Sequence, residues 1–315
     1  MKYGFGVDLG GTTVKLAYFD EEGNLLDKWE IPTVTANAGA QILPDIAATI
    51  RGYLDANNIP DCDILGIGIG VPGPVNSKGV VNRCVNLGWG VFHVEQALSD
   101  LTGFPVRAGN DANLAALGEC WKGSGQGCQN IVMVTLGTGV GGGIIIGGTV
   151  VCGAHGSAGE IGSMIIDRDE PEVHTSGVRG CVEQYCSATG IVRLARRYLA
   201  SHHTSSTLRQ ADPLTCKAVF DAGSAGDPAA LAILEQFYAL LGEFLANLCN
   251  VLDPEAVVLG GGVSKAGSVL LDGLQPHFIR HAFHALRDMR FTIATLGNDA
   301  GVYGAFKLAL QSFCK

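Results

Sequence analysis

The sequence predicts an α/β protein with two domains, each containing a glycine-rich strand–turn–strand hairpin. Three observations carry this prediction. The chain has 315 residues, of which 47% are apolar, predicted strands and helices alternate along it, and one strand–turn–strand pattern occurs twice. A chain of this length usually forms about two domains and buries roughly three quarters of its unfolded surface. The apolar content also excludes an intrinsically disordered protein.

Glycine is frequent in this chain and charge is scarce. There are 45 glycines, and only 16% of the residues are charged, against about 7% glycine and about 25% charged residues in an average protein. The glycines have no three-residue period and there are only 11 prolines, which excludes a collagen-like chain. The excess glycine therefore serves backbone geometry.

The net charge of −9 argues against partners that need a basic surface, namely nucleic acids and anionic membranes. It leaves open an anionic ligand that is held by backbone N–H groups. Residues 131–151 are long and uncharged enough to span a membrane, but they contain seven glycines, which favours a buried hairpin. We therefore expect no membrane partner.

Cysteine usage predicts the compartment. The chain begins Met1-Lys2-Tyr3 and leads directly into a strand-like segment, with no signal-peptide pattern. Ten cysteines in such a chain predict free thiols in a reducing cytoplasm.

The first predicted domain begins with a meander of strands over Tyr3–Asp8, Val14–Phe19 and Leu25–Ile31. Apolar residues recur every four positions from Ile42 to Leu54, which predicts a helix over residues 39–58. Further along we expect a buried strand, a helix, a strand and a second helix, at Ile64–Val71, 93–103, Val106–Ala108 and from about Asp111.

The second predicted domain repeats this beginning. Strands Ile131–Leu136 and Gly143–Ile146 around a glycine-rich turn restate the pattern of Phe5–Phe19, which indicates an internal duplication. A long helix over 229–252, a strand at Ala256–Leu259, a glycine turn and a helix from about Ser264 follow. The polar segment 201–228 reads as a surface loop.

The segment DLGGTTVK, which begins at Asp8, has the composition of a phosphate-binding turn. Gly10 and Gly11 let backbone N–H groups approach a phosphate. Thr12 can donate a hydroxyl, Lys15 can supply charge, and Asp8 can hold a cation directly or through water. The alternative for this motif alone is a tight hairpin whose glycines serve only the turn.

Two further turns strengthen the phosphate interpretation. LGTGVGGG, residues 136–143, places Thr138 between glycines at a strand end, and Gly260-Gly261-Gly262 follows a third strand. The chain contains neither the GxGxxG dinucleotide fingerprint at the junction of a predicted strand and a predicted helix nor the GxxxxGK[ST] loop, which argues against a Rossmann or P-loop protein. The recurrence of these turns favours a nucleotide phosphate site.

Seven motifs occur in an order that resembles the ROK sugar kinases, a family of the actin-like ATPase superfamily. The motifs are DLGGTTVK, GVPGPV, GNDAN, LGTGVGGG, GEIG, RGCVEQ and VVLGGGVS, and the resemblance extends from Asp8 to about Gly304. The stretch RGCVEQYCSATGIVRLARR looks particularly like the bacterial ROK glucokinases.

The resemblance implies two actin-like ATPase (ribonuclease H-like) α/β domains with an inter-domain cleft that closes on the sugar. We expect residues 1–115 plus 300–315 to form the N-terminal domain, with the first phosphate motif and the catalytic Asp. Residues 116–299 would form the C-terminal domain, with the second phosphate motif, the sugar loop, the adenosine turn and a dimerisation surface. The low charge and the apolar helix over 229–252 favour a homodimer.

The resemblance also assigns the nucleotide site and the base. Asp111 matches the family's catalytic base, and a carboxylate within reach of an alcohol can take its proton as the alcohol attacks phosphorus. Asp111 can also be the N-cap of a helix over 112–120, and both roles can hold together. The expected cofactors are ATP and Mg²⁺, with Mg²⁺ at Asp8. The expected ATP-binding residues are Asp8, Gly10, Gly11, Thr12, Thr13, Lys15, Gly137, Thr138, Gly139, Gly141, Gly260, Gly261 and Gly262.

The sugar site carried over from the family is rich in hydrogen-bonding side chains. The expected residues are Gly73, Asn86, Asn110, Asp111, Glu160, Glu183 and, with least support, His155.

The chain departs from the family at a structural zinc site. Most members have a His directly after GEIG and a CxCGxxGCxE segment, but Ser163 replaces that His and the segment here reads HTSGVRGCVE. His174 and Ser176 stand in place of two cysteines, and only Cys181 is kept. Because zinc sites need about four Cys, His or carboxylate ligands, we expect structural Zn²⁺ to be absent.

The expected function is ATP-dependent phosphorylation of a hexose, glucose at its 6-hydroxyl, by a glucokinase. Because the missing His usually also touches the sugar, other substrates stay open: N-acetylmannosamine, N-acetylglucosamine, fructose, mannose or a glucoside. A non-catalytic sugar-binding regulator is a lesser alternative. The family's regulators begin with a helix-turn-helix segment, whereas Asp8 lies near the start of this sequence.

Overall fold

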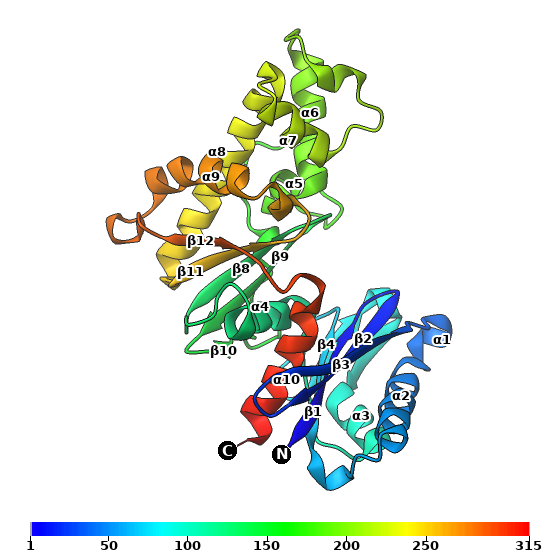
Figure 1. Ribbon diagram of the computed structural model, residues 1–315. Helices are drawn as coiled ribbons and strands as arrows, with labels where there is room; N and C mark the ends of the chain where they lie inside the picture. The colour runs from blue at the N-terminus through cyan, green and yellow to red at the C-terminus, as the bar shows by residue number, and fades with distance from the viewer. Residues whose placement is uncertain (1, 315) are drawn as a thin grey trace. The chain divides into compact units, whose positions relative to one another are not determined.

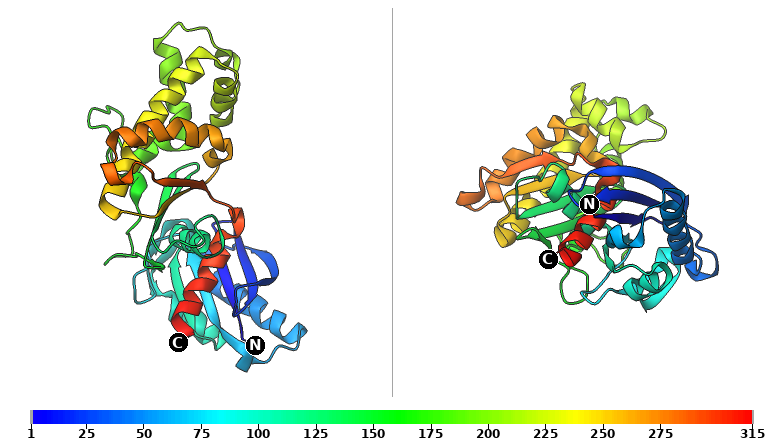
Figure 2. Two further views of the ribbon diagram at one scale, coloured as in Figure 1. Left: turned by 60° about the vertical axis from the view of Figure 1, so that its left-hand side comes forward. Right: turned by 60° about the horizontal axis from the view of Figure 1, so that its bottom comes forward.

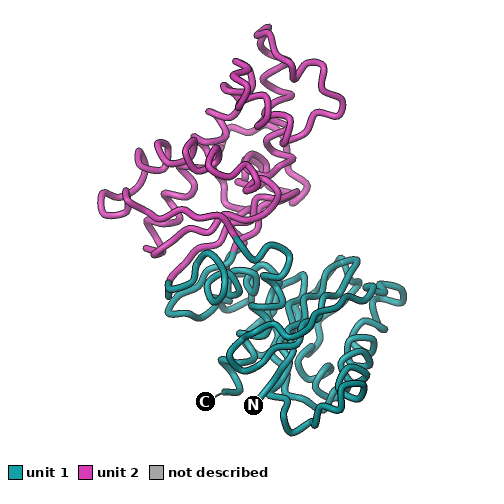
Figure 3. The backbone as a smooth tube through the Cα atoms, viewed as in Figure 1, with its two compact units in different colours: residues 1–129, 143–159, 295–315 teal, residues 130–142, 160–294 magenta. Residues whose placement is uncertain are grey.

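The computed structural model describes residues 2–314, which form two compact units (Figure 3). The first unit contains the chain up to Gln129 together with Gly143–Gly159 and the C-terminal segment from Thr295; the second contains Asn130–Gly142 and Glu160–Ala294. The expected division placed the first boundary near residue 115. The contacts instead keep the whole of helix α4 (Asp111–Lys122) in the first unit.

The first unit is built on a five-stranded sheet in the order β3-β2-β1-β4-β7. Strands β1, β2 and β3 form an antiparallel meander, whereas β1, β4 and β7 are parallel. Their bounds are Tyr3–Leu9, Thr13–Asp20, Leu25–Pro32, Ile64–Val71 and Val106–Asn110 for β1, β2, β3, β4 and β7. The meander and the two later strands confirm the prediction for this half of the chain.

The two faces of this sheet differ because apolar residues and glycines alternate along β1 and β4. Phe5 and Ile67 belong to the core that includes helices α2 (Ile42–Ala56) and α3 (Val94–Thr102). The intervening glycines face the C-terminal helix α10 (Ala300–Phe313). Side chains of successive strand residues point to opposite faces. The alternation therefore gives the sheet one face of apolar side chains and one face of glycines.

Helix α10 packs directly on the glycine face of the sheet, as Figures 1 and 2 show. A Cβ at Gly68 would lie 1.7 Å from the backbone oxygen of Ala305, and one at Gly304 would lie 1.7 Å from that of Leu114 in helix α4. No side chain fits at either position. Part of the glycine excess therefore allows helix and sheet backbones to touch.

The other five-stranded sheet repeats the strand order of the first. Its order is β10-β9-β8-β11-β12. If the strands of each sheet are numbered by their order along the chain, both sheets have the spatial order 3-2-1-4-5. The bounds of β8 to β12 are Ile131–Leu136, Val140–Ile146, Thr149–Val150, Ala256–Gly260 and Arg290–Ile293. The duplication inferred from the two glycine-rich hairpins is thus present in the topology.

The helices of the second unit share one apolar core with the strands β8 and β11. Helix α8 runs beside α9 (Figure 1). The bounds of α5 to α9 are Val182–Cys186, Ala188–Ser201, Cys216–Ser224, Pro228–Leu252 and Ser268–His281. By length and composition α8 could cross a membrane, and 61% of its most apolar stretch is buried in the protein, as in the core helix of a soluble domain.

Two secondary-structure predictions were wrong. Segment 201–228 is not a surface loop throughout, because it contains α7, whose Val219 and Phe220 are buried in the core. The helix expected from Ser264 begins four residues later, at Ser268, after a short 3₁₀ turn over Val263–Ala266.

Candidate active site

The first phosphate loop joins β1 to β2 and leaves backbone amides unused. The Gly10 amide donates to the Thr13 oxygen at 3.0 Å, and Thr33 donates to the oxygens of Gly10 and Thr12. Among residues 2–314, the amides of Gly11 and Thr12 donate no hydrogen bond to the protein. A Cβ at Gly11 would also meet nothing within 4 Å. This part of the loop is open for an anion to accept from amides.

Asp8 is the last residue but one of β1, beside this loop and directly opposite Lys15 in β2. Burial raises the pKa of the Asp8 carboxyl, and the charge of Lys15 partly lowers it again. Within the described residues the carboxylate has no hydrogen-bond partner, while the Lys15 ammonium donates to the Asn298 oxygen at 3.2 Å. A half-buried carboxylate with no protein donor fits a divalent cation, which supplies the missing positive charge.

Asn110 and Asp111 lie at the same edge of the sheet as Asp8. The strand registers put Asp8 beside Gly70 and Gly70 beside Gly109. Because adjacent strands lie about 4.8 Å apart, the ends of β1 and β7 are separated by about 10 Å of sheet. The fold therefore brings the predicted cation ligand and the predicted base to one edge.

The N-cap of helix α4 is Asn110, which corrects the alternative that gave this role to Asp111. The Asn110 side-chain oxygen accepts from the Asn113 amide at 3.1 Å, and its nitrogen donates to the Gly73 oxygen at 3.3 Å. Asp111 is the first helical residue, and its carboxylate accepts from the Ala112 amide at 2.8 Å. The helix N-terminus favours the ionised carboxylate, the form in which a general base accepts a proton.

Asn86 lies on a short turn, Val85–Leu87, between the strands β5 (Val80–Cys84) and β6 (Trp89–His93). The preceding thiol, Cys84, has a pKa raised by burial and also by the charge of Asp111. A Cβ on Gly73, whose oxygen accepts from Asn110, would lie 3.4 Å from the Cβ of Cys84, so this turn lies near the predicted base. Asn86 itself is exposed.

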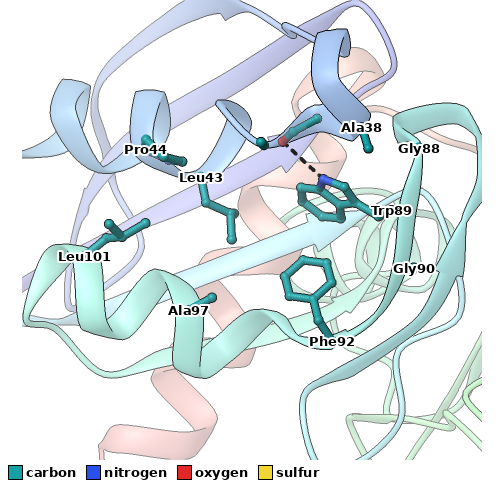
Figure 4. A pocket seen from close by; sticks show the side chains of 11 residues that line it. Ala38, Leu43, Pro44, Gly88, Trp89, Gly90, Phe92, Ala97 and Leu101 are labelled. Atoms are coloured by element: carbon teal, nitrogen blue, oxygen red, sulfur yellow. Dashed lines mark hydrogen bonds between the residues drawn. The ribbon is translucent and has the colours of Figure 1, made fainter.

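An apolar cavity of about 420 Å³ lies behind the Asn86 turn (Figure 4). Trp89 lines it and donates its indole N–H to the Gly39 oxygen at 3.2 Å. Phe92 meets Trp89 edge to face, with ring centroids 5.0 Å apart. This anchor for the turn was missed by the sequence analysis, because only the fold brings Gly39 next to Trp89.

The second phosphate loop joins β8 to β9 and, like the first, is held by hydrogen bonds to its backbone. The Gly137 amide donates to the Gly139 oxygen at 2.9 Å, which closes the turn. The start of helix α6 binds the loop through two hydrogen bonds: the Ala188 amide donates to the Gly137 oxygen, and the Thr189 hydroxyl donates to the Thr138 oxygen. Over residues 2–314 the amides of Thr138 and Gly139 have no protein acceptor, so they too are open to an anion.

The third glycine turn packs against the end of β8. Gly261 has φ +81°, and a Cβ there would lie 2.5 Å from the Leu136 oxygen, so only glycine fits. The Ser264 hydroxyl donates to the Gly261 oxygen at 2.8 Å. The second unit thus joins the turn Gly260–Gly262 to the second phosphate loop, whose last predicted residue, Gly141, lies in β9.

The remaining sugar candidates differ in their surroundings. Glu183, in α5, accepts from the Val140 amide at 2.8 Å and contacts His174. Glu160 and His155 are exposed, and Glu160 directly precedes the short turn Ile161–Ser163. In the described part of the chain neither side chain contacts another predicted site residue. Of these three residues, only Glu183 is hydrogen-bonded to a predicted phosphate-loop segment.

The residues at the family's zinc-ligand positions form no metal-binding cluster in the described structure. Among the described residues no three His, Cys, Asp or Glu side chains form a group that can hold a metal ion. His174 contacts Ser176 and Glu183, whereas Cys181 is buried at the start of α5. Burial also raises the pKa of the neighbouring Cys186 thiol, which opposes the thiolate that binds zinc.

The shared strand order and the glycine-rich loop after the first strand of each unit define the actin-like ATPase fold. Residues 4–312 match the ROK family. The glucokinase of Halalkalibacterium halodurans is 43% identical over 311 residues, covering 97% of this chain and 94% of that protein. The N-acetyl-D-glucosamine kinase of Yersinia pseudotuberculosis is 34% identical, covering 98% and 99%.

A solved structure agrees with these relatives. The ROK family glucokinase from Streptomyces griseus, in complex with glucose and AMPPNP, has a TM-score of 0.73 and 33% identity, covering 98% of this chain and 99% of that one. The chain belongs to the ROK family.

Proposed function

We propose that this protein phosphorylates a hexose with ATP, with glucose as the preferred substrate and its 6-hydroxyl as the acceptor. The observation that carries the proposal is the occurrence, in one ROK chain, of Asp111 at a helix N-terminus and of two loops with unused backbone amides. Relatives named glucokinase, one of them solved with glucose and an ATP analogue, support the same reaction.

The chemistry asks for a base and for positioning. The Asp111 carboxylate takes the proton of the attacking hydroxyl, while the open amides of the two loops hold the nucleotide's phosphates. Lys15 adds positive charge beside the first loop. Mg²⁺ would be held at Asp8, directly or through water, and would neutralise charge on the phosphates. Phosphoryl transfer needs little more from a protein than such placement and charge.

The sugar would be held by hydrogen bonds from Asn86, Glu160 and Glu183, with Gly73 and Asn110 lending backbone and side-chain groups. Asn110 already uses both ends of its amide within the protein, so we assign it one remaining donor and acceptor position. Ser163 is shorter than the family's usual His, which leaves space beside the sugar. N-acetylglucosamine is the alternative substrate, and the kinase from Yersinia favours testing it.

The proposal is tested by an ADP-release assay with glucose, mannose, fructose, N-acetylglucosamine and N-acetylmannosamine, each with and without Mg²⁺. We expect the highest kcat/KM for glucose and no turnover without Mg²⁺. Asp111→Asn should lower kcat by roughly 10²–10⁴-fold and leave glucose binding measurable by calorimetry. Asp55→Asn, an exposed change in α2, is the control. No activity on any hexose would overturn the proposal.

We further propose that the protein is a cytoplasmic homodimer that supplies hexose phosphate to glycolysis. All ten cysteines are free, which suits a reducing compartment. Val251, near the end of α8, is 81% exposed, and Phe283, two residues after α9, is 58% exposed; such apolar groups favour a partner surface. Light scattering during size exclusion measures the mass: twice the chain mass supports the dimer, and a single chain mass contradicts it.

A further inference from the structure

Glu183 is held at both carboxylate oxygens. Oε2 accepts from the Val140 amide at 2.8 Å, directly after the second phosphate loop. Oε1 lies 3.4 Å from Nε2 of His174. A Cβ on Gly139 would come within 2.3 Å of Oε2, so the carboxylate packs against the backbone of the loop itself. Glu183 therefore joins the phosphate loop to the segment that carries His174.

The hydrogen bonds around His174 decide which ring nitrogen faces Glu183 with a proton. The Ser176 amide points to Nδ1 at 3.3 Å, and the Ser176 hydroxyl lies 2.9 Å from the same atom. An amide can only donate, so Nδ1 is an acceptor and the ring proton is on Nε2. The protonated nitrogen Nε2 is thus the ring atom that lies beside the Glu183 carboxylate, at the ion-pair distance of 3.4 Å.

The segment that presents His174 is fixed by protein contacts. The His174 amide donates to the Val178 oxygen at 2.7 Å, which closes a tight hairpin. The base of that hairpin is tied to α5, because Gln184 donates to the Glu172 oxygen and accepts from the Gly180 amide.

A buried ion pair fixes the same base to α6. Arg197 makes two hydrogen bonds to Glu170, whose side chain has no exposed surface, at 2.7 and 2.8 Å. This guanidinium holds the pKa of Glu170 well below its usual range. Both ends of the hairpin base are anchored, so the position of His174 does not depend on its contact with Glu183. The ring can therefore fix the orientation of the Glu183 carboxylate.

We propose that His174 is a positioning residue that orients the Glu183 carboxylate for a sugar hydroxyl. The inference rests on the proposed function, since it assigns Glu183 to the sugar. His174 does not itself touch the reacting atoms. Losing its N–H leaves one oxygen of Glu183 unrestrained, while the Val140 amide still holds the other. The effect should therefore fall on sugar binding and spare the phosphate loop.

The test compares His174→Ala, His174→Gln and Ser176→Ala in steady-state kinetics and calorimetry. We expect His174→Ala to raise the glucose KM and Kd about 5–10-fold, as for the loss of one polar contact of ordinary strength, with kcat and the ATP KM within about 2-fold of wild type. His174→Gln should recover most of the loss, because its amide can direct an N–H at the same oxygen. Ser176→Ala should lie between. His203→Ala, an exposed change, is the matched control.

Each further outcome decides the question. In a Glu183→Gln background the His174→Ala change should have no additional effect, and an undiminished effect would overturn the inference. A glucose Kd unchanged by His174→Ala, in an active enzyme, also overturns it while leaving the proposed function intact. If the wild-type protein neither binds nor phosphorylates any hexose, both the inference and the proposed function are overturned. One zinc per chain that is lost in His174→Ala would show a metal ligand instead. Thermal melting checks that each variant is folded.

Discussion

Asp8 shows how a single residue can weaken the fold while it serves the site. Its carboxylate is half-buried beside Gly301, where a Cβ would lie 2.6 Å from the carboxyl carbon. Because burial raises its pKa, the folded state favours the protonated acid. The resulting cost to stability is absent well below the ordinary pKa of 3.8, grows as the group ionises, and is complete above the raised pKa.

Asp8→Asn should therefore stabilise the free protein at neutral pH and abolish Mg²⁺-dependent turnover. We expect Tm at pH 7 to rise by on the order of 2 °C and kcat/KM for MgATP to fall at least 10²-fold. The stability gain should shrink as pH approaches 3.8. Scanning calorimetry from pH 4 to pH 8 measures it, with Asp55→Asn as the control. A lower Tm at pH 7 would contradict this account of Asp8.

At the same scale, Asn110 and His174 show what residue types alone leave undecided. The motif GNDAN identifies a helix start but not which of Asn110 and Asp111 caps it, since both side chains can accept the required hydrogen bond. The pairing of His174 with Glu183 depends on a hairpin that brings them together across nine sequence positions. Neither periodicity nor composition contains that information.

At the scale of elements, Glu119 joins α4 to the segment that leads into α10. Its carboxylate is fully buried and accepts from the amides of Ser124, Thr295 and Leu296 at 2.9, 3.1 and 2.7 Å. The same segment continues to Asn298, whose backbone oxygen accepts a hydrogen bond from the Lys15 ammonium. One side chain thus fixes the backbone on which the phosphate-loop lysine rests.

Glu119→Gln should destabilise the protein, because an amide nitrogen would then face backbone N–H donors. We expect a loss of about 2–4 kcal/mol in the free energy of unfolding, measured by urea denaturation. Glu243→Gln on the exposed side of α8 is the matched control and should change stability by less than about 0.5 kcal/mol. Equal effects of the two changes would rule out this role for Glu119.

Helix α10 offers a second prediction at this scale. Gly304→Ala would push a methyl group against the Leu114 oxygen, so we expect a loss of about 3 kcal/mol or more, or failure to fold. Gly52 lies in α2 with open space at its Cβ position. Gly52→Ala should instead stabilise by up to about 1 kcal/mol. Chemical denaturation of both variants gives the comparison, and a stable Gly304→Ala protein would refute the close packing.

Elements were predictable where periodicity was long and clear. The Ile42–Leu54 spacing predicted α2, and the near-continuous apolar run Ile64–Val71 predicted β4. Helix α7 was missed because it is short and follows a run of Ser and Thr, so its two buried residues, Val219 and Phe220, gave too little pattern. Only the tertiary core that receives them makes this segment helical.

At the scale of the whole molecule, the duplication was readable in the sequence because its function requires glycine. Both hairpins need amides free of side chains, so the two loops kept a common composition. The strand orders of the two sheets then followed as one pattern used twice. The helices around the sheets share no such requirement, and their arrangement in the second unit, with α6 and α7 beside α8, had no counterpart in the sequence pattern.

The glycine face beneath α10 has a genetic consequence. Any single-nucleotide change that alters a glycine codon yields a stop or a residue with a Cβ, and at Gly6 or Gly68 that atom would collide with the backbone of the helix. No conservative exchange exists there, and neighbouring positions cannot compensate, since the obstacle is main chain rather than side chain. These codons should be nearly immutable in any population that depends on the enzyme, although they lie on the opposite face of the sheet from most of its apolar core.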